Sequence, residues 1–543
     1  MDKAHSQRLL TSNGKRHPKH NEMTQVIFVA FCLVFMIWAL VANRLKPGLI
    51  LLTCVVMMLC AGILQPKECL EGFSNKGMIT VGLLFLVSEG VRRSGLLEQL
   101  ILSILPQKRT TVTRANAQLL PAIAALSAFL NNTPVVVIFA PIIKNWARKV
   151  GLSHTKFLIP LSYATILGGI CTLIGTSTNL VVDGLIQDSG REGMGMFEIG
   201  KVGIIICLVG LLYLIFYSHC LLPDNRETDT EDAEDKYKAE GIHAVEIVLR
   251  SRFPGLGKSL SEFDFYRHYG ATVHSIRRCG SLLRGDWMNM PLENHDTLML
   301  GTDDKFVQTY QESSAFLISS YDTDSYPLDH SKRYLAVLLL VFMVVGATIG
   351  ELPAVRALVP GFRFDMFFFV CLTTVIMAWT KIFNPRKYSK YISWDVLVTI
   401  ACAFAISKGM QNSGFADQIA DLIIACADAI GQTHHGPYAM MAILFLITNL
   451  FTELITNNAA AALSFPLALA VAEKLGVDPM PFFICICIAA SAAFSTPIGY
   501  QTNLLVQGIG GYRFTDYVKV GLPLNIIVFL ISIFIIPMIW PIR

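Results

Sequence analysis

Charged residues are scarce in this sequence. Of its 543 residues only 15% are Asp, Glu, Lys or Arg, and 53% are hydrophobic, whereas a soluble domain carries about 25% charged residues. The formal net charge is +4, and the basic residues are dispersed along the chain. A nucleic-acid-binding protein gathers its basic residues into a patch, so the composition argues against a nucleic-acid partner. It favours a chain that is surrounded by lipid.

Patterned cysteines are also lacking. The 13 cysteines form no C-x-x-C pair, and most of them lie inside apolar runs. In such runs cysteine behaves as a small buried hydrophobe, so we expect these cysteines to form no disulfide framework. The pair His434-His435 has no third ligand beside it and is interpreted as polar surface. No nucleophile motif was found, so the sequence predicts no enzyme, no catalytic residue and no bound cofactor.

Long apolar runs are what the sequence has instead, and roughly 20 apolar residues cross a bilayer as a helix. No signal peptide with a small-residue cleavage site precedes them, so the first run is predicted to be a span. Six runs precede a hydrophilic stretch at about 223–332, and six follow it. They lie at roughly 25–43, 47–64, 77–91, 116–143, 157–185 and 202–222, then at 334–350, 364–380, 392–407, 437–470, 480–509 and 517–540.

The two apolar halves share three motifs in the same order. The pairs are Ser127-x4-Asn132 with Thr452-x4-Asn457, Thr172-x2-Gly175-x3-Asn179 with Thr496-x2-Gly499-x3-Asn503, and residues 88–99 with residues 407–418. Three matched motifs in one order indicate an internal duplication. Such repeats are typical of secondary transporters.

Basic residues between the apolar runs predict the orientation of each run. Lys and Arg flank both ends of run 116–143, so by the positive-inside rule both ends are cytoplasmic. This run is therefore predicted to be a re-entrant hairpin with Asn131-Asn132-Thr133 at its tip. In the second half, residues 409–436 hold acidic residues and no Lys or Arg. Run 437–470 is accordingly predicted to enter from outside, with Thr456-Asn457-Asn458 at its tip.

Hairpins that enter from opposite sides make an inverted repeat. The predicted fold class is an all-α polytopic membrane protein with about five crossings and one re-entrant hairpin per half, and a small α+β insert in the cytoplasm. The expected domains are a polar tail (1–24), a first membrane repeat (25–222), the insert (223–332) and a second membrane repeat (333–543). Ten crossings place the N-terminus outside, although residues 1–22 are basic. A missed crossing, an exceptional tail and a start at Met23 all remain open.

Polar residues gather at the predicted hairpin tips. Helix ends in mid-membrane leave backbone groups unpaired, which is tolerated only where they line a cavity. Helix N-termini at such a point attract an anion, whereas free carbonyls and the oxygens of Asn132 and Asn457 suit sodium. Gly175 and Gly499 allow unwound segments beside the tips. The alternative is that these residues only pack helices together. Helix packing can explain any single one of these polar residues, but it explains poorly why the whole set occurs in both halves.

With these motifs the sequence resembles the divalent anion–sodium symporters of the wider ion-transporter superfamily, over both membrane halves. The family signature is a Ser-Asn-Thr triplet at each tip. Here Asn131-Asn132-Thr133 and Thr456-Asn457-Asn458 keep the central Asn and depart at the flanking positions. This departure leaves sulfate and a C4-type dicarboxylate both open as substrates. The resemblance also implies a homodimer and an elevator-like movement of the hairpins against a scaffold.

The resemblance implies binding residues, position by position, with sodium as the coupling ion. The implied first sodium site is Ser127, Asn132 and Gly175, and the second is Thr452, Asn457 and Ser495. The implied anion site lies between the tips, near Asn132, Thr133, Thr176, Asn457, Asn458, Thr496 and Pro497.

The insert begins with an acidic stretch from Asp224 to Asp235, interpreted as a solvated tether. Beyond it, short strand-like segments alternate with turns. Over about 240–304 this pattern looks like the TrkA-C regulatory domain of potassium-uptake proteins, which implies a small regulatory ligand of unknown identity. Gly257-Lys258-Ser259 is not a phosphate-binding loop, because Arg252 stands where that motif needs its first Gly.

The sequence therefore predicts sodium-coupled symport of a small divalent anion by an integral protein of a bacterial cytoplasmic membrane. A sodium/proton antiporter or an arsenite-type exporter of the same superfamily is the alternative. It would need a titratable carboxylate pair beside the broken helices, and only Glu453 lies close to them. A transporter-like sensor that reports anion binding to the insert is a third hypothesis.

Overall fold

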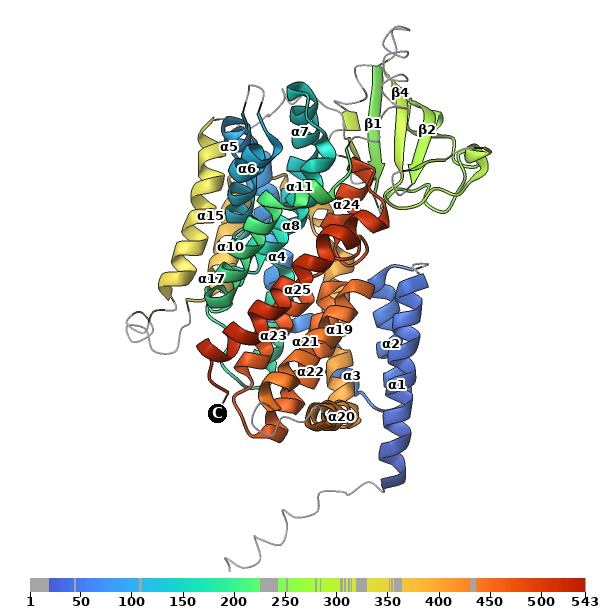
Figure 1. Ribbon diagram of the computed structural model, residues 1–543. Helices are drawn as coiled ribbons and strands as arrows, with labels where there is room; N and C mark the ends of the chain where they lie inside the picture. The colour runs from blue at the N-terminus through green and yellow to red at the C-terminus, as the bar shows by residue number, and fades with distance from the viewer. Residues whose placement is uncertain are drawn as a thin grey trace, which may run out of the picture.

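The computed structural model describes most of the chain as a helical bundle with a small sheet at one end (Figure 1). The described residues are 19–42, 45–106, 110–224, 243–250, 252–278, 281–283, 285–302, 306, 309–310, 313, 315–318, 330–350, 352, 355, 364–429 and 436–542. Most of the polar tail, the acidic tether after Asp224 and the pair His434-His435 lie outside these residues. The predictions made for them stay predictions.

The helices of the first half follow the expected order, with breaks inside the longer apolar runs. They are α1 (Lys19–Ala42), α2 (Pro47–Cys60), α3 (Pro66–Ser74), α4 (Lys76–Ser94), α5 (Leu96–Ile104), α6 (Val112–Ser127), α7 (Asn132–Val150), α8 (Leu158–Gly169), α9 (Ser177–Asp188), α10 (Gly200–Phe216) and α11 (Ser218–Leu221).

The second half repeats this order of helices and breaks. Its helices are α15 (His330–Gly350), α17 (Met366–Trp379), α18 (Tyr388–Tyr391), α19 (Trp394–Asn412), α20 (Phe415–Ala429), α21 (Gly436–Leu454), α22 (Asn457–Leu475), α23 (Met480–Ser491), α24 (Gln501–Gly510) and α25 (Phe514–Ile539).

The breaks fall at matched positions in the two halves. Gly95, at φ 67°, separates α4 from α5, and Gly414, at φ 74°, separates α19 from α20. A side chain would be strained at both points, which explains why the repeated motif keeps Gly there. The chain also breaks just before Asn132 and just before Asn457, at the two predicted tips.

Contacts between the halves recur with the two halves exchanged. Helix α2 packs on α19, and its counterpart α17 packs on α4. Helix α7 likewise packs on α24, and its counterpart α22 packs on α9. The repeated sequence motifs therefore lie on elements that are packed in the same way.

Apolar side chains cover the outside of the bundle, as expected for a membrane protein. Trp38 of α1 is 66% exposed and Met538 of α25 is 73% exposed. Four described helical stretches are long and apolar enough to cross a membrane: Met23–Ala42, Pro66–Ser94, Ser331–Gly350 and Phe514–Ile539. The other apolar helices are shorter or broken, so helix length alone does not count the crossings. The protein is an integral membrane protein with many apolar helices.

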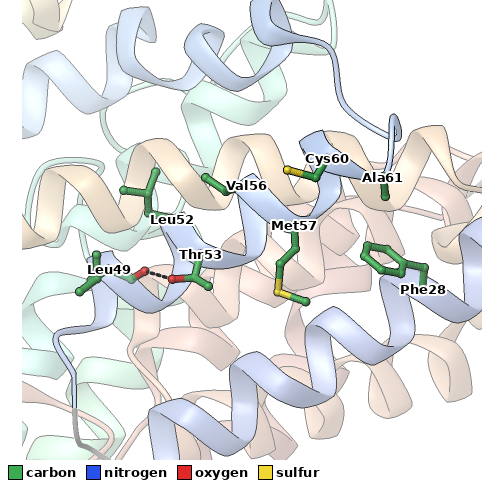
Figure 2. A pocket seen from close by; sticks show the side chains of 8 residues that line it. All are labelled: Phe28, Leu49, Leu52, Thr53, Val56, Met57, Cys60 and Ala61. Carbon is green, nitrogen blue, oxygen red and sulfur yellow. Dashed lines mark hydrogen bonds between the residues drawn. The ribbon is translucent and has the colours of Figure 1, made fainter.

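A groove between α1 and α2 belongs to this outer surface (Figure 2). Its lining is apolar apart from Thr53, whose hydroxyl donates to the carbonyl O of Leu49 on the same helix at 2.8 Å. Among the described residues that line it, the groove therefore offers a mainly apolar surface.

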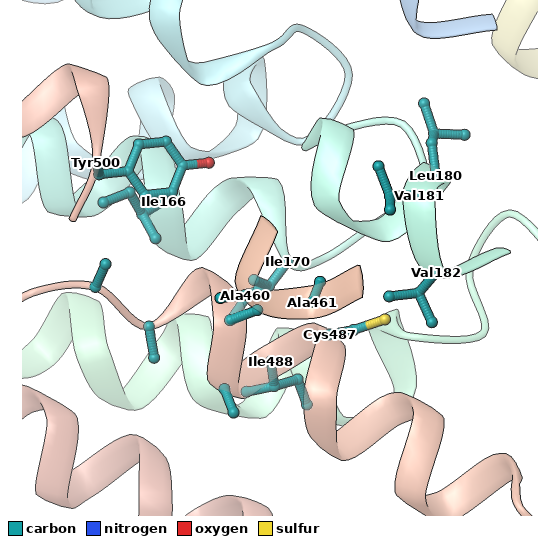
Figure 3. Packing of buried hydrophobic residues seen from close by; sticks show 14 of the residues in the cluster. Ile166, Ile170, Leu180, Val181, Val182, Ala460, Ala461, Cys487, Ile488 and Tyr500 are labelled. Carbon is teal, nitrogen blue, oxygen red and sulfur yellow. The ribbon is translucent and has the colours of Figure 1, made fainter. Parts of the chain in front are cut away.

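Buried side chains from both halves form one hydrophobic core. Figure 3 shows residues of α8, α9, α22 and α23 in this cluster, with Tyr500 among them. Small residues let the helices approach closely. A Cβ on Gly168 of α8 would lie 2.1 Å from the carbonyl O of Ala124 on α6. Such contacts between small residues are typical of membrane helices, because lipid supplies no hydrophobic force to hold them together.

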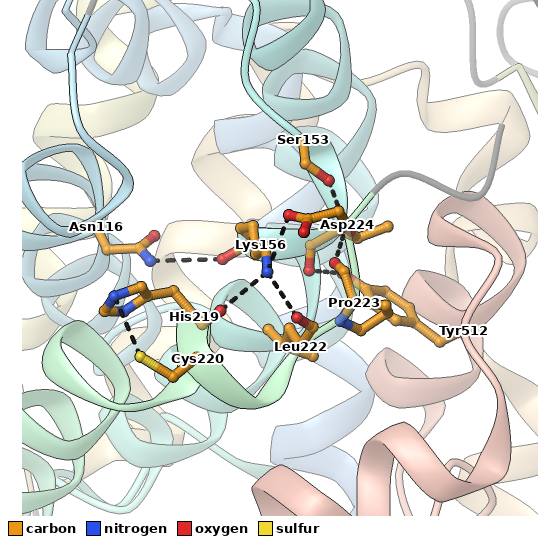
Figure 4. Close-up of polar contacts among 10 residues, drawn as sticks. Asn116, Ser153, Lys156, His219, Cys220, Leu222, Pro223, Asp224 and Tyr512 are labelled. Atoms are coloured by element: carbon orange, nitrogen blue, oxygen red, sulfur yellow. Dashed lines mark hydrogen bonds and ion pairs between the residues drawn. The ribbon is translucent and has the colours of Figure 1, made fainter. Parts of the chain in front are cut away.

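Lys156 fixes the point where the chain leaves the first half (Figure 4). Its Nζ donates to the carbonyl O of His219 at 3.0 Å and of Leu222 at 2.6 Å. These carbonyls lie at the C-terminal end of α11, where a cation is favourable. Thr155 donates to the carbonyl O of Pro223 at 2.7 Å. The start of the insert is thereby tied to the bundle.

The insert folds as a small antiparallel sheet. Its elements are β1 (His243–Leu249), α13 (Phe265–Tyr269), β2 (Thr272–Arg278), β3 (Ser281–Leu282), β4 (Thr297–Thr302) and β5 (Phe316–Ile318), with strand order β3-β2-β4-β1-β5. One face of β1 and β4 packs on aromatic residues that include Phe253, Phe263 and Phe265. The insert therefore has a hydrophobic core of its own.

We expect Arg278→Met to loosen this sheet. The Arg278 guanidinium donates to both carboxylate oxygens of Asp296, at 2.9 and 2.8 Å, and Asp296 is 1% exposed. Removing one partner of a buried ion pair costs about 3–5 kcal/mol. Hydrogen exchange of the β2 and β4 amides in the full-length protein should become faster. Arg267→Met, at an exposed residue of α13, is the control, and equal exchange in the two variants would contradict the prediction.

Candidate functional site

The first tip brings two predicted site residues into contact. Ser127 ends α6 and Asn132 begins α7, and both are fully buried. The Ser127 hydroxyl donates to Asn132 Oδ1 at 2.7 Å. Because Asn132 begins a helix, the backbone N–H groups of this turn have no partner within the helix. The tip combines neutral side-chain oxygens with the positive end of a helix dipole.

An unwound stretch, residues 170–176, lies beside this tip. Thr172 Oγ1 donates to the carbonyl O of Ala128 and accepts from the Gly175 N–H at 3.1 Å. Asn179 Nδ2 donates to the carbonyls of Thr172 and Gly169, at 2.9 and 3.4 Å. These bonds hold the two ends of the unwound stretch together and satisfy polar groups that the missing helix would have paired.

Glycine is required where this stretch meets the tip. A Cβ on Gly169 would lie 2.7 Å from Asn132 Oδ1, and a Cβ on Gly175 would lie 2.6 Å from the carbonyl O of Gly169. Both distances are too short for a carbon contact. The predicted first sodium set, Ser127, Asn132 and Gly175, therefore lies in one small region around Gly169.

The second half repeats the same hydrogen-bond pattern. Thr496 Oγ1 donates to the carbonyl O of Glu453 and accepts from the Gly499 N–H, at 3.0 and 3.2 Å. Asn503 Nδ2 donates to the carbonyls of Ala493 and Thr496, at 2.8 and 3.2 Å. The acceptors lie ten and seven residues before Asn503, as they do before Asn179 in the first half. The duplicated motif thus has the same structural role in both halves.

Hydrogen bonds join four helix N-termini into one cluster. Asn132, the first residue of α7, donates to Tyr500 Oη at 2.5 Å, and Tyr500 is the N-cap of α24. Tyr500 Oη lies 3.1 Å from Oγ1 of Thr176, the N-cap of α9. Ser177 of α9 donates to Oδ1 of Asn458, in the first turn of α22, at 3.0 Å. The N-termini of α7, α24, α9 and α22 therefore meet at one place.

Tyr500 is the central residue that sequence analysis missed. It is 5% exposed, and its hydroxyl faces Asn132, Thr176 and Asn457. A signal was present, because Tyr500 follows Thr496 by four residues as Thr176 follows Thr172. The repeat therefore placed Tyr500 at the position of Thr176, which was already a candidate residue.

The predicted anion residues gather around this cluster to different degrees. Asn132, Thr176 and Asn458 take part in its hydrogen bonds, and Asn457 faces Tyr500. Thr133 is the second residue of α7. Thr496 and Pro497 lie in the unwound stretch before Tyr500, where the Thr496 hydroxyl is bonded to the Glu453 carbonyl.

The predicted second sodium set is less compact than the first. Thr452 Oγ1 donates to the carbonyl O of Ala490 at 2.6 Å. Ser495 Oγ accepts from Asn525 Nδ2 of α25 at 2.7 Å. Asn457 faces Tyr500 instead. These three side chains are thus bonded to separate partners in this conformation.

Glu453 links the second tip to α25. Its Oε1 accepts from the Ser495 N–H and from Asn525 Nδ2, each at 2.8 Å. Both donors are neutral, and the bond to Asn525 is an interhelical hydrogen bond. Within the described part of the two tips and their unwound stretches, Glu453 is the one carboxylate.

Comparison with known proteins identifies related chains. The sequence profile of the citrate transporter family (CitMHS) matches residues 33–470 and, in a second match, residues 427–542. The chain is similar to the "Uncharacterized transporter sll0640" of Synechocystis sp., at 28% identity over 90% of this chain and 93% of that one. It is similar to the "Putative sulfur deprivation response regulator" of Chlamydomonas reinhardtii, at 25% identity over 88% and 95%. It is also similar to "Sodium/sulfate cotransporter 1" of Chlamydomonas reinhardtii, at 22% identity over 87% and 85%.

We expect Tyr500→Phe to destabilise the protein by about 1–3 kcal/mol, because it leaves the buried Asn132 amide without its acceptor. Thermal unfolding in detergent should begin at a lower temperature than in the wild type. Tyr334→Phe is the matched control, since Tyr334 is 64% exposed on α15. If both variants unfold at the wild-type temperature, the Tyr500 hydroxyl does not hold the four N-termini together.

Proposed function

The chain belongs to the citrate transporter family, and we propose that it performs sodium-coupled symport of a small divalent anion, either sulfate or a C4-type dicarboxylate. The family and the relatives are transporters, so the chain is not an enzyme. Their names also confirm the resemblance to divalent anion–sodium symporters. Sodium coupling and the identity of the anion are parts of our proposal.

The meeting of four helix N-termini carries this proposal. Each N-terminus bears roughly half a positive charge, so the cluster around Tyr500 attracts an anion and is electrostatically unfavourable without one. Neither tip nor unwound stretch contains a Lys or Arg. A dianion at this depth would face a desolvation cost of several kcal/mol or more. Bound cations would supply the remaining countercharge.

Neutral oxygens beside the tips support sodium as that cation. We propose Ser127, Asn132 and Gly175 for the first site and Thr452, Asn457 and Ser495 for the second, with carbonyls of the unwound stretches as further ligands. Three buried oxygens near these residues lack a hydrogen-bond partner among the described residues: Asn179 Oδ1, Thr456 Oγ1 and Asn525 Oδ1. Because unpaired buried oxygens are costly, they support cation binding here. To bind the ion, the side chains of Thr452 and Ser495 would have to give up their present hydrogen bonds to Ala490 and Asn525.

Sulfate is the first substrate to test, because relatives that span most of the chain are named for sodium/sulfate cotransport and for the response to sulfur deprivation. The sodium/proton antiporter alternative is less well supported. It needs two titratable carboxylates, whereas the described tips and unwound stretches contain Glu453 alone. The sensor alternative is tested by the same uptake measurement, because a sensor would bind the anion without transporting it.

The proposed architecture is an inverted repeat of residues 25–222 and 333–543, with the insert at 223–332 in the cytoplasm. The reciprocal contacts between the halves and the matched breaks support the repeat. We place the protein in a bacterial cytoplasmic membrane as a homodimer. We further propose that the insert is a TrkA-C-like module that binds a small regulatory ligand. Its small antiparallel sheet supports this assignment.

Uptake into proteoliposomes tests the proposed function. An inward sodium gradient should drive accumulation of labelled sulfate or of a labelled C4-dicarboxylate, and an equal potassium gradient should not. Citrate, the substrate named by the family, is the comparison. Binding of an anion without uptake would favour the sensor, and proton-driven sodium efflux would favour the antiporter.

We expect Asn132→Ala and Asn457→Ala each to reduce sodium-driven uptake to background while the protein remains folded. Each change removes the one triplet residue that both halves share and that contributes to both the proposed ion sites and the anion site. Asn289→Ala, at an exposed residue of the insert, is the control. Wild-type uptake by either well-folded tip variant would refute the assignment of that tip.

The orientation of the insert can be tested separately. A cysteine in place of exposed Lys258 should react with a membrane-impermeant reagent only after the cells are opened, since we place the insert in the cytoplasm. Reaction in intact cells would reverse the topology. A chain that lacks residues 223–332 should retain sodium-driven uptake, because the tips and unwound stretches lie entirely outside the insert.

A further inference from the structure

The sheet of the insert has a second buried face, which lies against the helical bundle. Val245, Ile247 and Leu249 of β1 pack in the insert's own core, so the alternate residues Glu246 and Val248 point the other way. Val248 is 0% exposed and belongs to the core of the bundle. Figure 1 shows β1 and β4 beside α7 and α24. The insert is thus packed on α7 and α24, two of the four helices whose N-termini meet at Tyr500.

A buried ion pair fastens this face to α7. Lys144 Nζ of α7 lies 2.7 Å from Glu246 Oε2, and the two side chains are 1% and 5% exposed. Lys144 Nζ also donates to the carbonyl O of Ile509, at the end of α24, at 3.0 Å. From β4, Thr297 Oγ1 donates to the carbonyl O of Gly508 at 2.9 Å. The insert therefore binds α7 and α24 together.

The insert also holds a second group of helices. Arg252 donates through Nη1 to the carbonyl O of Lys390 and through Nη2 to the carbonyl O of Ile392, each at 2.9 Å. These carbonyls belong to α18 and to the residues just before α19. Helix α18 packs on α4, and α19 packs on α2. The insert thus links α7 and α24 to α18 and to the start of α19, a helix that also packs on α22.

The ion pair has a direct mechanical connection to the first tip. Lys144 and Asn132 lie on the same helix, twelve residues apart, which is ~18 Å at 1.5 Å per residue. Pro141 lies between them, but α7 is continuous from Asn132 to Val150, so the helix connects the constraint at Lys144 to Asn132. Contacts made in only one conformation shift the population toward that conformation.

We propose that the docked insert is an intramolecular brake on transport. By holding α7 and α24 against the segment of α18 and α19, it stabilises the present arrangement, and its release speeds the alternation of access that transport requires. A ligand of the insert would act by strengthening or weakening this docking. The proposal rests on the proposed transport function, because a brake needs a movement to oppose.

Two independent variants of the full-length chain test the brake. The double variant Lys144→Met/Glu246→Gln removes both buried charges, so neither is left unpaired, and Arg252→Gln releases the other group of helices. Each should raise the initial rate of sodium-driven uptake by about threefold or more, as the restrained conformation loses population. Lys258→Met, at an exposed lysine of the insert, should keep the wild-type rate.

Hydrogen exchange gives a readout that needs no substrate. In both variants the amides of β1 and β4 and those of residues 128–133 should exchange faster than in the wild type. The brake is wrong if β1 and β4 loosen while residues 128–133 and the uptake rate stay at wild-type values, or if loosening slows uptake. If the wild type takes up no anion with sodium, the proposed function fails. Unchanged exchange at residues 128–133 would then refute the brake by itself.

Discussion

Four helix N-termini that meet inside the bundle are the constraint on which the rest of the structure depends. Helices α7, α9, α22 and α24 begin around Tyr500, and hydrogen bonds that involve Asn132, Thr176 and Ser177 join them. Their dipoles repel one another when nothing negative lies between them. In a low-dielectric interior this repulsion is screened less than in water. An anion would relieve it, which is why we propose that this structural junction is also the anion site.

The same constraint explains the sequence around each break. A helix that begins in mid-membrane requires another to end or unwind beside it, and every freed backbone group then needs a partner. Asn179 and Asn503 supply those partners, and each bonds to carbonyls at the same spacing along the chain. Gly175 and Gly499 lie so close to neighbouring backbone that a side chain would not fit. The residues that the two halves share at these points are those that satisfy a broken backbone. The matched positions Thr176 and Tyr500, which we propose to face the anion, differ between the halves.

Sequence patterns predicted the breaks but not the contacts between them. The spacing Thr-x2-Gly-x3-Asn marked both unwound stretches, because local hydrogen bonds decide it. Tyr500 was missed, since a tyrosine in an apolar run indicates packing until its partner from the other half is known. The Lys144–Glu246 ion pair could not be predicted from the sequence either, because the two residues lie 102 positions apart and meet only through tertiary packing. Thr452 and Ser495 were placed by resemblance alone, and they are bonded to separate partners in this conformation.

In the transport mechanism that we propose, cations bound at the tips supply the countercharge for a dianion held by the four N-termini. Calorimetric titration of sulfate into the purified protein, in sodium buffer and in choline buffer, tests it most directly. We expect sodium to tighten sulfate binding by at least about tenfold, and sulfate to tighten sodium binding by the same factor, because linkage is reciprocal. Equal sulfate affinities in the two buffers would show that bound cations do not supply the countercharge.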